Sequence, residues 1–388
     1  MKSIVYFDNA ATSWPKPKTV FQAIQNYLED IGGSPGRSGH RMSINASRLI
    51  EDVRETVANF FACPDNSRII FTKNVTEALN ICFFGLLKPG DHVITSSVEH
   101  NSVMRPLRYL EQNGVSLSIA KAYSDGSLDP GEIKKNIKTN TRLIVTTHAS
   151  NVTGTILPIK EIASIAAERG IPFLIDCAQT AGALPIDIDL KKNRNCIIAF
   201  TGHKSLFGPT GTGGMCIGSD VEVPSLIFGG TGSKSDKDIQ PDFLPDMLES
   251  GTINVSGLAG LKAGIDFIME RSLTEVRAHE KSLLSKFLNE VAQIKGIKIY
   301  CNGDADGQIG VVSFNLSNLS PSEVGLILDR KYNIMCRVGL HCNPNAHKTI
   351  GTFPDGTVRF GFSYFNTIKQ VEFSTQALRE ITIINQLD

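Results

Sequence analysis

Short runs of hydrophobic residues alternate with longer amphipathic segments through the first two-thirds of this 388-residue chain. The hydrophobic runs predict buried strands at residues 68–72, 91–95, 117–122, 142–147, 172–176 and 196–200. The amphipathic segments predict helices at residues 17–29, 76–87, 103–113 and 159–169. Strands that alternate with helices are typical of a mainly parallel sheet covered by helices on both faces. We therefore predict an α/β fold.

The pattern changes near residue 256, where strands no longer alternate regularly with helices. Predicted helices at 257–270 and 273–294 are followed by strands at 297–301 and 310–316, a helix at 322–330, a strand at 357–363 and a helix at 369–384. This arrangement predicts a smaller α+β domain. We expect an N-terminal segment (1–15) that packs near the active site, a large domain (16–256) and a small C-terminal domain (257–388).

The composition narrows the class of protein. Hydrophobic residues make up 41% of the chain and charged residues 20%, as in soluble globular proteins. Lys plus Arg and Asp plus Glu both number 39, and a net charge of zero argues against nucleic acid binding. The sequence has no apolar run of 18 residues and no signal-like start, so we expect no membrane contact and a cytoplasmic location. The eight cysteines form no CxxC pair and are expected to be mostly free, buried thiols.

Asp176 and Lys204 are the strongest candidates for catalytic chemistry. Each follows a predicted strand, and their separation of 204 − 176 = 28 residues corresponds to about one strand–helix–strand unit. Both side chains are then expected at the carboxyl edge of one sheet, where open α/β folds bind ligands. A Schiff-base lysine and an acid that keeps a pyridine nitrogen protonated suit pyridoxal phosphate (PLP). The alternatives are a solvated loop lysine and a P-loop, and His203 between Gly202 and Lys204 excludes the P-loop.

Three further polar groups follow predicted strands. Thr76 opens a helix whose amide groups favour a phosphate, and its hydroxyl could add a donor; the alternative, which the position of Thr76 alone favours, is an ordinary helix cap. His100 could stack on a flat ring, or be a surface or capping histidine. Asn151 could bind a substrate carboxylate through its amide, or be part of an ordinary turn.

Cys342 lies in a predicted loop, in which Arg337 and His341 precede it and Asn343-Pro344 follows it. A cationic, flexible setting favours the thiolate, which is the nucleophilic form of cysteine. A structural cysteine is the ordinary alternative, and a metal site with His341 and His347 would lack a convincing fourth ligand. Arg359, on the alternating strand, could clamp a carboxylate or be a solvated edge residue.

These elements, in this order, resemble the cysteine desulfurases and selenocysteine lyases, which are fold-type I PLP enzymes of the class V aminotransferase group. The resemblance runs essentially end to end. The most specific segments are Asn74-Val75-Thr76-Glu77, Glu99-His100, Asp176-Cys177-Ala178-Gln179, Thr201-Gly202-His203-Lys204 and Arg337-Val338-Gly339-Leu340-His341-Cys342. The resemblance implies a large, mainly parallel sheet domain and a smaller α+β domain that carries Cys342 and Arg359.

The resemblance also implies a role for each matching position. Lys204 would form the Schiff base and shuttle the substrate α-proton, and Cys342 would take sulfur as a persulfide. The positions that would bind the cofactor are Lys204, Asp176 at the pyridine nitrogen, Gln179 at the ring hydroxyl, His100 stacked on the ring, Val75, Thr76, Thr201 and His203 at the phosphate end, and Thr252 at the phosphate of a partner subunit. The positions that would bind the substrate are Asn151, Arg359 and Arg337.

The activity implied by the resemblance is conversion of L-cysteine to L-alanine by a homodimer. Selenocysteine lyase activity, or another PLP lyase or aminotransferase reaction on the same fold, is the alternative. The short loop 337–342 resembles that of the Suf-type, group II enzymes, which implies that sulfur or selenium passes to an acceptor protein. The chain departs from the usual Suf-type sequence at Leu340, where histidine is frequent, and over residues 343–356.

Overall fold

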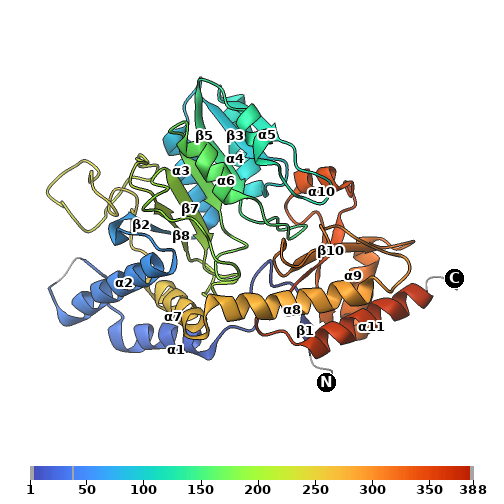
Figure 1. The fold of residues 1–388 in the computed structure, drawn as a ribbon. Coiled ribbons are helices and arrows are strands. Elements are labelled where there is room, and N and C mark those ends of the chain that lie inside the picture. The colour runs from blue at the N-terminus through green and yellow to red at the C-terminus, as the bar shows by residue number, and fades with distance from the viewer. Residues whose placement is uncertain (1–3, 37–38, 385–388) are drawn as a thin grey trace.

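The structure of the chain is a computed structural model that describes residues 4–36 and 39–384. A seven-stranded sheet forms the centre of the larger part of the molecule (Figure 1). Its strands in spatial order are β2 (Ile69–Thr72), β8 (Gly213–Ile217), β7 (Cys196–Thr201), β6 (Phe173–Asp176), β5 (Thr141–Thr147), β3 (His92–Ser96) and β4 (Ser116–Ala120). Within this sheet, only β8 runs antiparallel to its neighbours. The predicted mainly parallel sheet is therefore confirmed.

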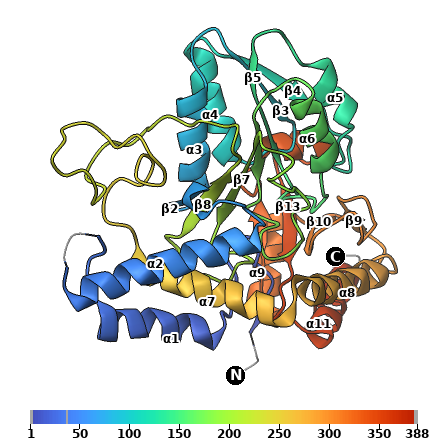
Figure 2. The same cartoon turned by 60° about the vertical axis from the view of Figure 1, so that its left-hand side comes forward.

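Helices cover both faces of this sheet (Figures 1 and 2). The helices of this part of the chain are α1 (Lys18–Asn26), α2 (Arg41–Phe60), α3 (Val75–Leu86), α4 (Asn101–Gln112), α5 (Pro130–Lys135), α6 (Ile159–Ala167) and α7 (Val255–Arg271). The sequence analysis missed α2, α5 and β8. The signal for α2 was present, because Ile50, Val53 and Val57 recur at helical spacing and are buried. The glycine-rich sequence of β8 gave no comparable strand signal.

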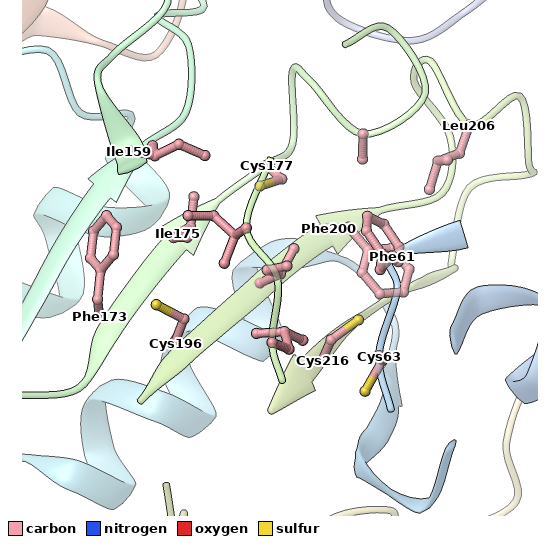
Figure 3. Close-up of a cluster of buried hydrophobic side chains, with 14 of the residues drawn as sticks. Phe61, Cys63, Ile159, Phe173, Ile175, Cys177, Cys196, Phe200, Leu206 and Cys216 are labelled. Atoms are coloured by element: carbon pink, nitrogen blue, oxygen red, sulfur yellow. The ribbon is translucent and has the colours of Figure 1, made fainter. Parts of the chain in front are cut away.

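Two hydrophobic clusters fill the spaces between the sheet and its helices. Figure 3 shows one of them, to which β6, β7 and β8 contribute Phe173, Phe200 and Cys216, and in which the ring of Phe61 at the end of α2 lies 4.9 Å from that of Phe200. Complete burial of an aromatic side chain of this size contributes about 1.5–3 kcal/mol to folding.

All eight cysteines are free and five are buried, as predicted from their spacing, while Cys342 is exposed.

A second, four-stranded sheet lies in the C-terminal part of the chain, in the order β12 (Arg337–Gly339), β13 (Thr357–Gly361), β10 (Val311–Leu316) and β9 (Ile297–Ile299). The helices α8 (Leu273–Val291), α9 (Pro321–Tyr332) and α11 (Ile368–Ile384) belong to this part, and α8 and α11 lie side by side (Figures 1 and 2). The short helix α10 (Pro344–Ile350) follows the Cys342 loop, where the sequence analysis expected no helix.

The first strand of the chain and the two long helices α7 and α8 connect the two parts of the molecule. The strand β1 (Val5–Tyr6) pairs with β11 (Ile334–Met335), so the first described residues of the chain join its C-terminal part. Buried side chains of α7, and Val276 of α8, belong to the cluster beneath the large sheet, whereas Leu283 of α8 belongs to the cluster of the small sheet. The change from one hydrophobic core to the other therefore comes within α8. None of the described helices combines the length and the hydrophobicity that crossing a bilayer requires.

Candidate active site

A cavity of about 220 Å³ opens at the carboxyl edge of the large sheet. Its walls come from the ends of strands β5, β6 and β7 and from the beginnings of helices α3 and α4. The residues that line it are Asn74, Val75, Thr76, His100, Ser102, Thr147, Asn151, Asp176, Ala178, Gln179, Thr201, His203 and Lys204. Most of the predicted site residues, although distant in sequence, therefore share one cavity.

Asp176 and Lys204 lie in the same cavity wall, as their spacing predicts. Burial raises the pKa of Asp176, while the amide N–H of Ala178, 2.9 Å from Oδ1, and the charge of Lys204 lower it. Burial lowers the pKa of Lys204 from 10.5 to about 8, and Asp176 opposes this shift while Arg359 adds to it. About a tenth of Lys204 is therefore an uncharged amine at pH 7, far more than for an ordinary lysine.

One end of the cavity is suited to an anion. Helix α3 begins there, and the amide groups of its first turn have no partner inside the helix. Asn74, and not Thr76, caps this helix, because Asn74 Oδ1 accepts the N–H of Glu77 at 3.0 Å. Thr76 is therefore free to face the cavity. Thr201 Oγ1 and His203 Nδ1 are buried and have no hydrogen-bond partner in the described part of the chain.

The N-terminal segment holds His203 from behind. The backbone carbonyl of His203 accepts hydrogen bonds from Thr12 Oγ1 at 3.1 Å, from the N–H of Ser13 at 3.1 Å and from Lys16 Nζ at 3.1 Å. Gln179 is fixed in a similar way, because its Nε2 donates to the carbonyl of Ala10 at 3.1 Å. The beginning of the chain thus forms part of the support of the cavity.

His100 both caps α4 and lines the cavity. Its Nδ1 accepts the N–H of Ser102 at 3.0 Å, so the capping interpretation is confirmed together with the placement at the site. Burial, together with the nearby cations Lys204, Arg337, Arg359 and Arg105, lowers the pKa of His100 to about 4. The ring that lines the cavity is therefore neutral at physiological pH.

Arg359 is almost completely buried beside Asn151. Its Nη1 donates to the backbone carbonyl of Asn151 at 3.0 Å, and its Nη2 pairs with Asp8 Oδ1 at 3.0 Å. The solvated edge arginine that the strand pattern allowed is therefore wrong. Burial lowers the pKa of Arg359, and the charge of Asp8 opposes this shift. Arg359 Nε is also buried, and no described residue accepts a hydrogen bond from it.

Cys342 lies at the mouth of the cavity. It lines an adjacent hollow of about 470 Å³, which shares Thr76, His100 and Ser102 with the cavity. Arg337 Nη2 lies 3.5 Å from Cys342 Sγ, so the predicted cationic neighbour is present. The exposed thiol can thus be reached from solvent while it borders the Lys204 site.

His341 of this loop and His347 of helix α10 each form a hydrogen bond with a different threonine. The rings of His341 and His347 lie 5.4 Å apart, with His341 Nε2 bonded to Thr357 Oγ1 at 2.9 Å and His347 Nδ1 bonded to Thr352 Oγ1 at 2.7 Å. Burial lowers the pKa of His347 to about 4. Both rings are therefore neutral parts of the small domain's packing.

Thr252 does not line the Lys204 cavity of its own chain. It is exposed and lies on two other hollows, one beside Arg54 and Glu249 and the other beside Phe71 and Leu258.

Four residues that line the cavity were not predicted individually from the sequence: Asn74, Ser102, Thr147 and Ala178. The signal for Asn74 and Ser102 was their position beside Thr76 and His100 at helix starts.

Comparison with known proteins places these observations in a family. A family model described as aminotransferase class-V matches residues 5–373. A relative named probable cysteine desulfurase from Methanothermobacter thermautotrophicus is 34% identical over 388 residues, which cover 98% of this chain and 95% of the relative. The cysteine desulfurase of Haloferax volcanii is 31% identical over 386 residues, covering 97% of this chain and 88% of that protein.

Solved structures agree with the sequence comparison. The apo structure of cysteine desulfurase from Thermococcus onnurineus NA1 has a TM-score of 0.90 and 32% identity, covering 98% of this chain and 95% of that chain. The cysteine desulfurase CsdA from Escherichia coli has a TM-score of 0.86 and 26% identity, again covering 98% and 95%. The fold and the sequence agree along nearly the whole chain, and the chain belongs to the class-V aminotransferase family.

Proposed function

We propose that this protein is a PLP-dependent cysteine desulfurase that converts L-cysteine to L-alanine and captures the sulfur on Cys342. One observation carries the proposal: the cavity that holds Lys204 and Asp176 borders an exposed cysteine. The relatives named cysteine desulfurase, which match this chain over nearly its whole length, support the same reaction.

The residues of the cavity fit PLP. Thr201 Oγ1 and His203 Nδ1 are buried polar atoms that have no hydrogen-bond partner among the described residues, and both residues line the cavity at which helix α3 begins, where a phosphate would be favoured. Asp176 would pair with the pyridine nitrogen, Gln179 would face the ring hydroxyl and His100 would stack on the ring. When bound, PLP supplies an electron sink for the bonds at the substrate α-carbon.

The side chains of this chain would then perform the remaining steps. Lys204, which is partly uncharged because of its lowered pKa of about 8, would take the α-proton of the substrate and return a proton later. Arg359 and Asn151 would hold the substrate carboxylate, and Arg337 would assist at the mouth of the cavity. Cys342 Sγ would attack the substrate sulfur, so that an S–S bond forms as the Cβ–S bond breaks. The electron pair of that bond stays with the carbon skeleton, which leaves as alanine after protonation.

We also propose that the protein works as a homodimer, with residues 16–256 as the cofactor-binding domain and residues 257–388 as its smaller companion. Thr252 lies outside its own cavity, so it could reach a bound phosphate only from a second copy. The segment 218–254 beside it projects from the body in both views (Figures 1 and 2). Phe228 and Ile239 of this segment are 71% and 73% exposed, as is expected of side chains that a partner covers.

The free cysteines favour a reducing compartment, and we propose a cytoplasmic location. The loop length supports transfer of the sulfur to an acceptor protein, for which the exposed Cys342 is accessible.

The test is the intact mass of purified, PLP-loaded protein after addition of L-cysteine, with peptide mapping. We expect one added sulfur on Cys342 that a reductant removes, together with released alanine. Cys336→Ser is the matched control, because burial raises the pKa of Cys336 to about 12 and makes it a poor nucleophile. Absence of added sulfur on Cys342, or the same sulfur on Cys336, would contradict the proposal.

A further inference from the structure

The loop that carries Cys342 is held to the rim of the large sheet by hydrogen bonds at three consecutive residues, His341, Cys342 and Asn343. The carbonyl of His341 accepts from Asn151 Nδ2 at 2.8 Å, and the carbonyl of Cys342 accepts the N–H of Asn101 at 2.9 Å. Asn343 Nδ2 donates to the carbonyl of Val98 at 2.8 Å. The nucleophile is therefore positioned by contacts across the two parts of the molecule.

The surroundings allow only one orientation of the completely buried amide of Asn343. Its Oδ1 faces the N–H of Ala346 at 3.0 Å, a group that can only donate. Its Nδ2 faces the carbonyl of Val98, a group that can only accept. These two backbone groups determine which atom of the amide is oxygen and which is nitrogen.

The orientation of Asn343 in turn determines that of Asn151. Asn343 Nδ2 also donates to Asn151 Oδ1 at 3.0 Å, so the oxygen of Asn151 must face Asn343. Asn151 Nδ2 then donates one hydrogen to the carbonyl of His341, and its second hydrogen remains available to the cavity that Asn151 lines. The cap of helix α10 thus sets the direction in which a residue of the active-site cavity presents its donor.

Backbone conformation makes this support necessary. His341 and Cys342 have φ values of 48° and 57°, in the left-handed region that residues other than glycine rarely adopt. Such a conformation persists only where the surrounding structure enforces it. The hydrogen bonds of Asn101, Asn151 and Asn343 supply that enforcement.

We propose that Asn343 is a positioning residue that couples substrate binding to the placement of the nucleophile. Through one amide it orients Asn151 toward the substrate carboxylate and holds the Cys342 loop against the rim of the cavity. The coupling rests on the proposed function, since it assigns the substrate carboxylate to Asn151. Asn343 lies in residues 343–356, the segment in which this chain departs from the usual Suf-type sequence.

Three substitutions in the full-length, PLP-loaded protein separate this role from a general structural one. Asn343→Ser keeps an oxygen that caps α10 and removes both donated hydrogen bonds. Asn343→Asp keeps the size of the side chain and places an oxygen against the acceptors of Val98 and Asn151. Asn345→Asp is the matched control, because it makes the same change two residues away: Thr349 bonds to the backbone carbonyl of Asn345, whose side chain has no hydrogen-bond partner among the described residues.

The first readout is the steady-state kinetics of alanine release from L-cysteine. We expect Asn343→Ser to raise KM and to lower kcat, each by at least about threefold, and Asn343→Asp to have the larger effect. In an Asn151→Ala background the rise in KM should disappear, because Asn343 then has no amide to orient. If Asn343→Ser changes KM by the same factor in both backgrounds, Asn343 is only structural and the proposal is wrong.

The second readout is hydrogen–deuterium exchange at the N–H of Asn101, measured without substrate. Loss of the Asn343 bonds should free the carbonyl of Cys342 and speed this exchange by about tenfold in Asn343→Ser, with no change in Asn345→Asp. Unchanged exchange in Asn343→Ser would overturn the proposal. If the wild-type protein releases no alanine, the proposed function fails, while the exchange still decides whether Asn343 holds the loop. If Asn343→Asp does not fold, Asn343→Ser carries both measurements.

Discussion

Two regions meet at the candidate active site, and they are built in different ways. The rim of the large sheet places Asp176 and Lys204 directly after strands, and it places Thr76 and His100 at helix starts. The Cys342 loop instead follows a three-residue edge strand of the small sheet and depends on side-chain hydrogen bonds to the rim.

The two regions therefore differ in rigidity, and we expect them to differ in their chemical roles. The rim is fixed by the backbone ladders of a buried sheet, so its groups are already in place for a cofactor. The loop is held by a few hydrogen bonds, each worth only about 0.5–1.5 kcal/mol, so a thiol on it can be displaced at little cost. We infer that the rim binds and activates the substrate, and that the loop delivers the nucleophile.

Removal of the rim lysine should have the largest effect. We expect Lys204→Ala to reduce alanine release from L-cysteine by about 10⁴-fold or more, because no other described amine lines the cavity to move the α-proton. Lys73→Ala is the control, since Lys73 is close to the same rim but its side chain is 80% exposed. Alanine release by Lys204→Ala within tenfold of wild type would refute the assignment.

Removal of the loop nucleophile should separate two substrates. We expect Cys342→Ala to lose about 10²-fold or more of the activity with L-cysteine, because no thiol remains to accept the sulfur. Activity with L-selenocysteine should stay within about tenfold, since selenium leaves readily without a thiol acceptor.

Assays of alanine formation with both substrates make this comparison, with Cys336→Ala as the control for a half-buried thiol whose pKa is raised to about 12. An equal loss with both substrates would show that the loop does more than accept sulfur. An unchanged rate with L-cysteine would remove Cys342 from the mechanism.

The rim could be predicted from the sequence and most of the loop could not. Asp176 and Lys204 follow two adjacent parallel strands, β6 and β7, and the topology of parallel sheets places both at one edge, although the described connection between these strands contains no helix of the kind that the spacing predicted. Thr76 and His100 were found for the same reason, although the identity of the capping residue Asn74 was not. The local pattern was sufficient wherever the backbone alone determined the position of a side chain.

The loop required contacts between residues that are far apart in the chain. Asn343 and Asn151 are separated by 192 positions, and no periodicity or motif spacing relates them. Arg359 was correctly placed on a strand, but its ion pair with Asp8 depends on how the N-terminal segment crosses the small sheet. The short helix α10 was missed because it depends on packing and not on local pattern.

The rim also makes a prediction about pH. Lys204 must be uncharged to attack the aldehyde of PLP, and its pKa is lowered to about 8. The rate of PLP uptake by the cofactor-free protein should therefore rise about tenfold with each unit of increasing pH up to pH 8 and stay constant above it. Rapid-mixing absorbance measures this rate, and free Nα-acetyl-lysine is the control, whose rate should keep rising toward the ordinary pKa of 10.5. A protein that follows the free amine would contradict the lowered pKa.

The smallest effect is expected from a comparison of two capping asparagines, one on the rim and one in the loop. Asn74 caps α3 and Asn343 caps α10, each through Oδ1. Serine is about as good a cap as asparagine, so Asn74→Ser should change the free energy of unfolding by less than about 0.5 kcal/mol, whereas Asn74→Ala should cost about 1 kcal/mol. Denaturant unfolding measures both values.

The same pair tests whether capping alone explains Asn343. Asn74→Ser should leave hydrogen exchange at Asn101 unchanged, because the amide oxygen of Asn74 bonds to Glu77 within its own helix α3. Asn343→Ser also keeps its cap, but it loses the bonds to Val98 and Asn151 and should speed that exchange. If the two serine variants behave alike, the loop is as firmly built as the rim, and the distinction between a fixed binding edge and an adjustable nucleophile does not hold.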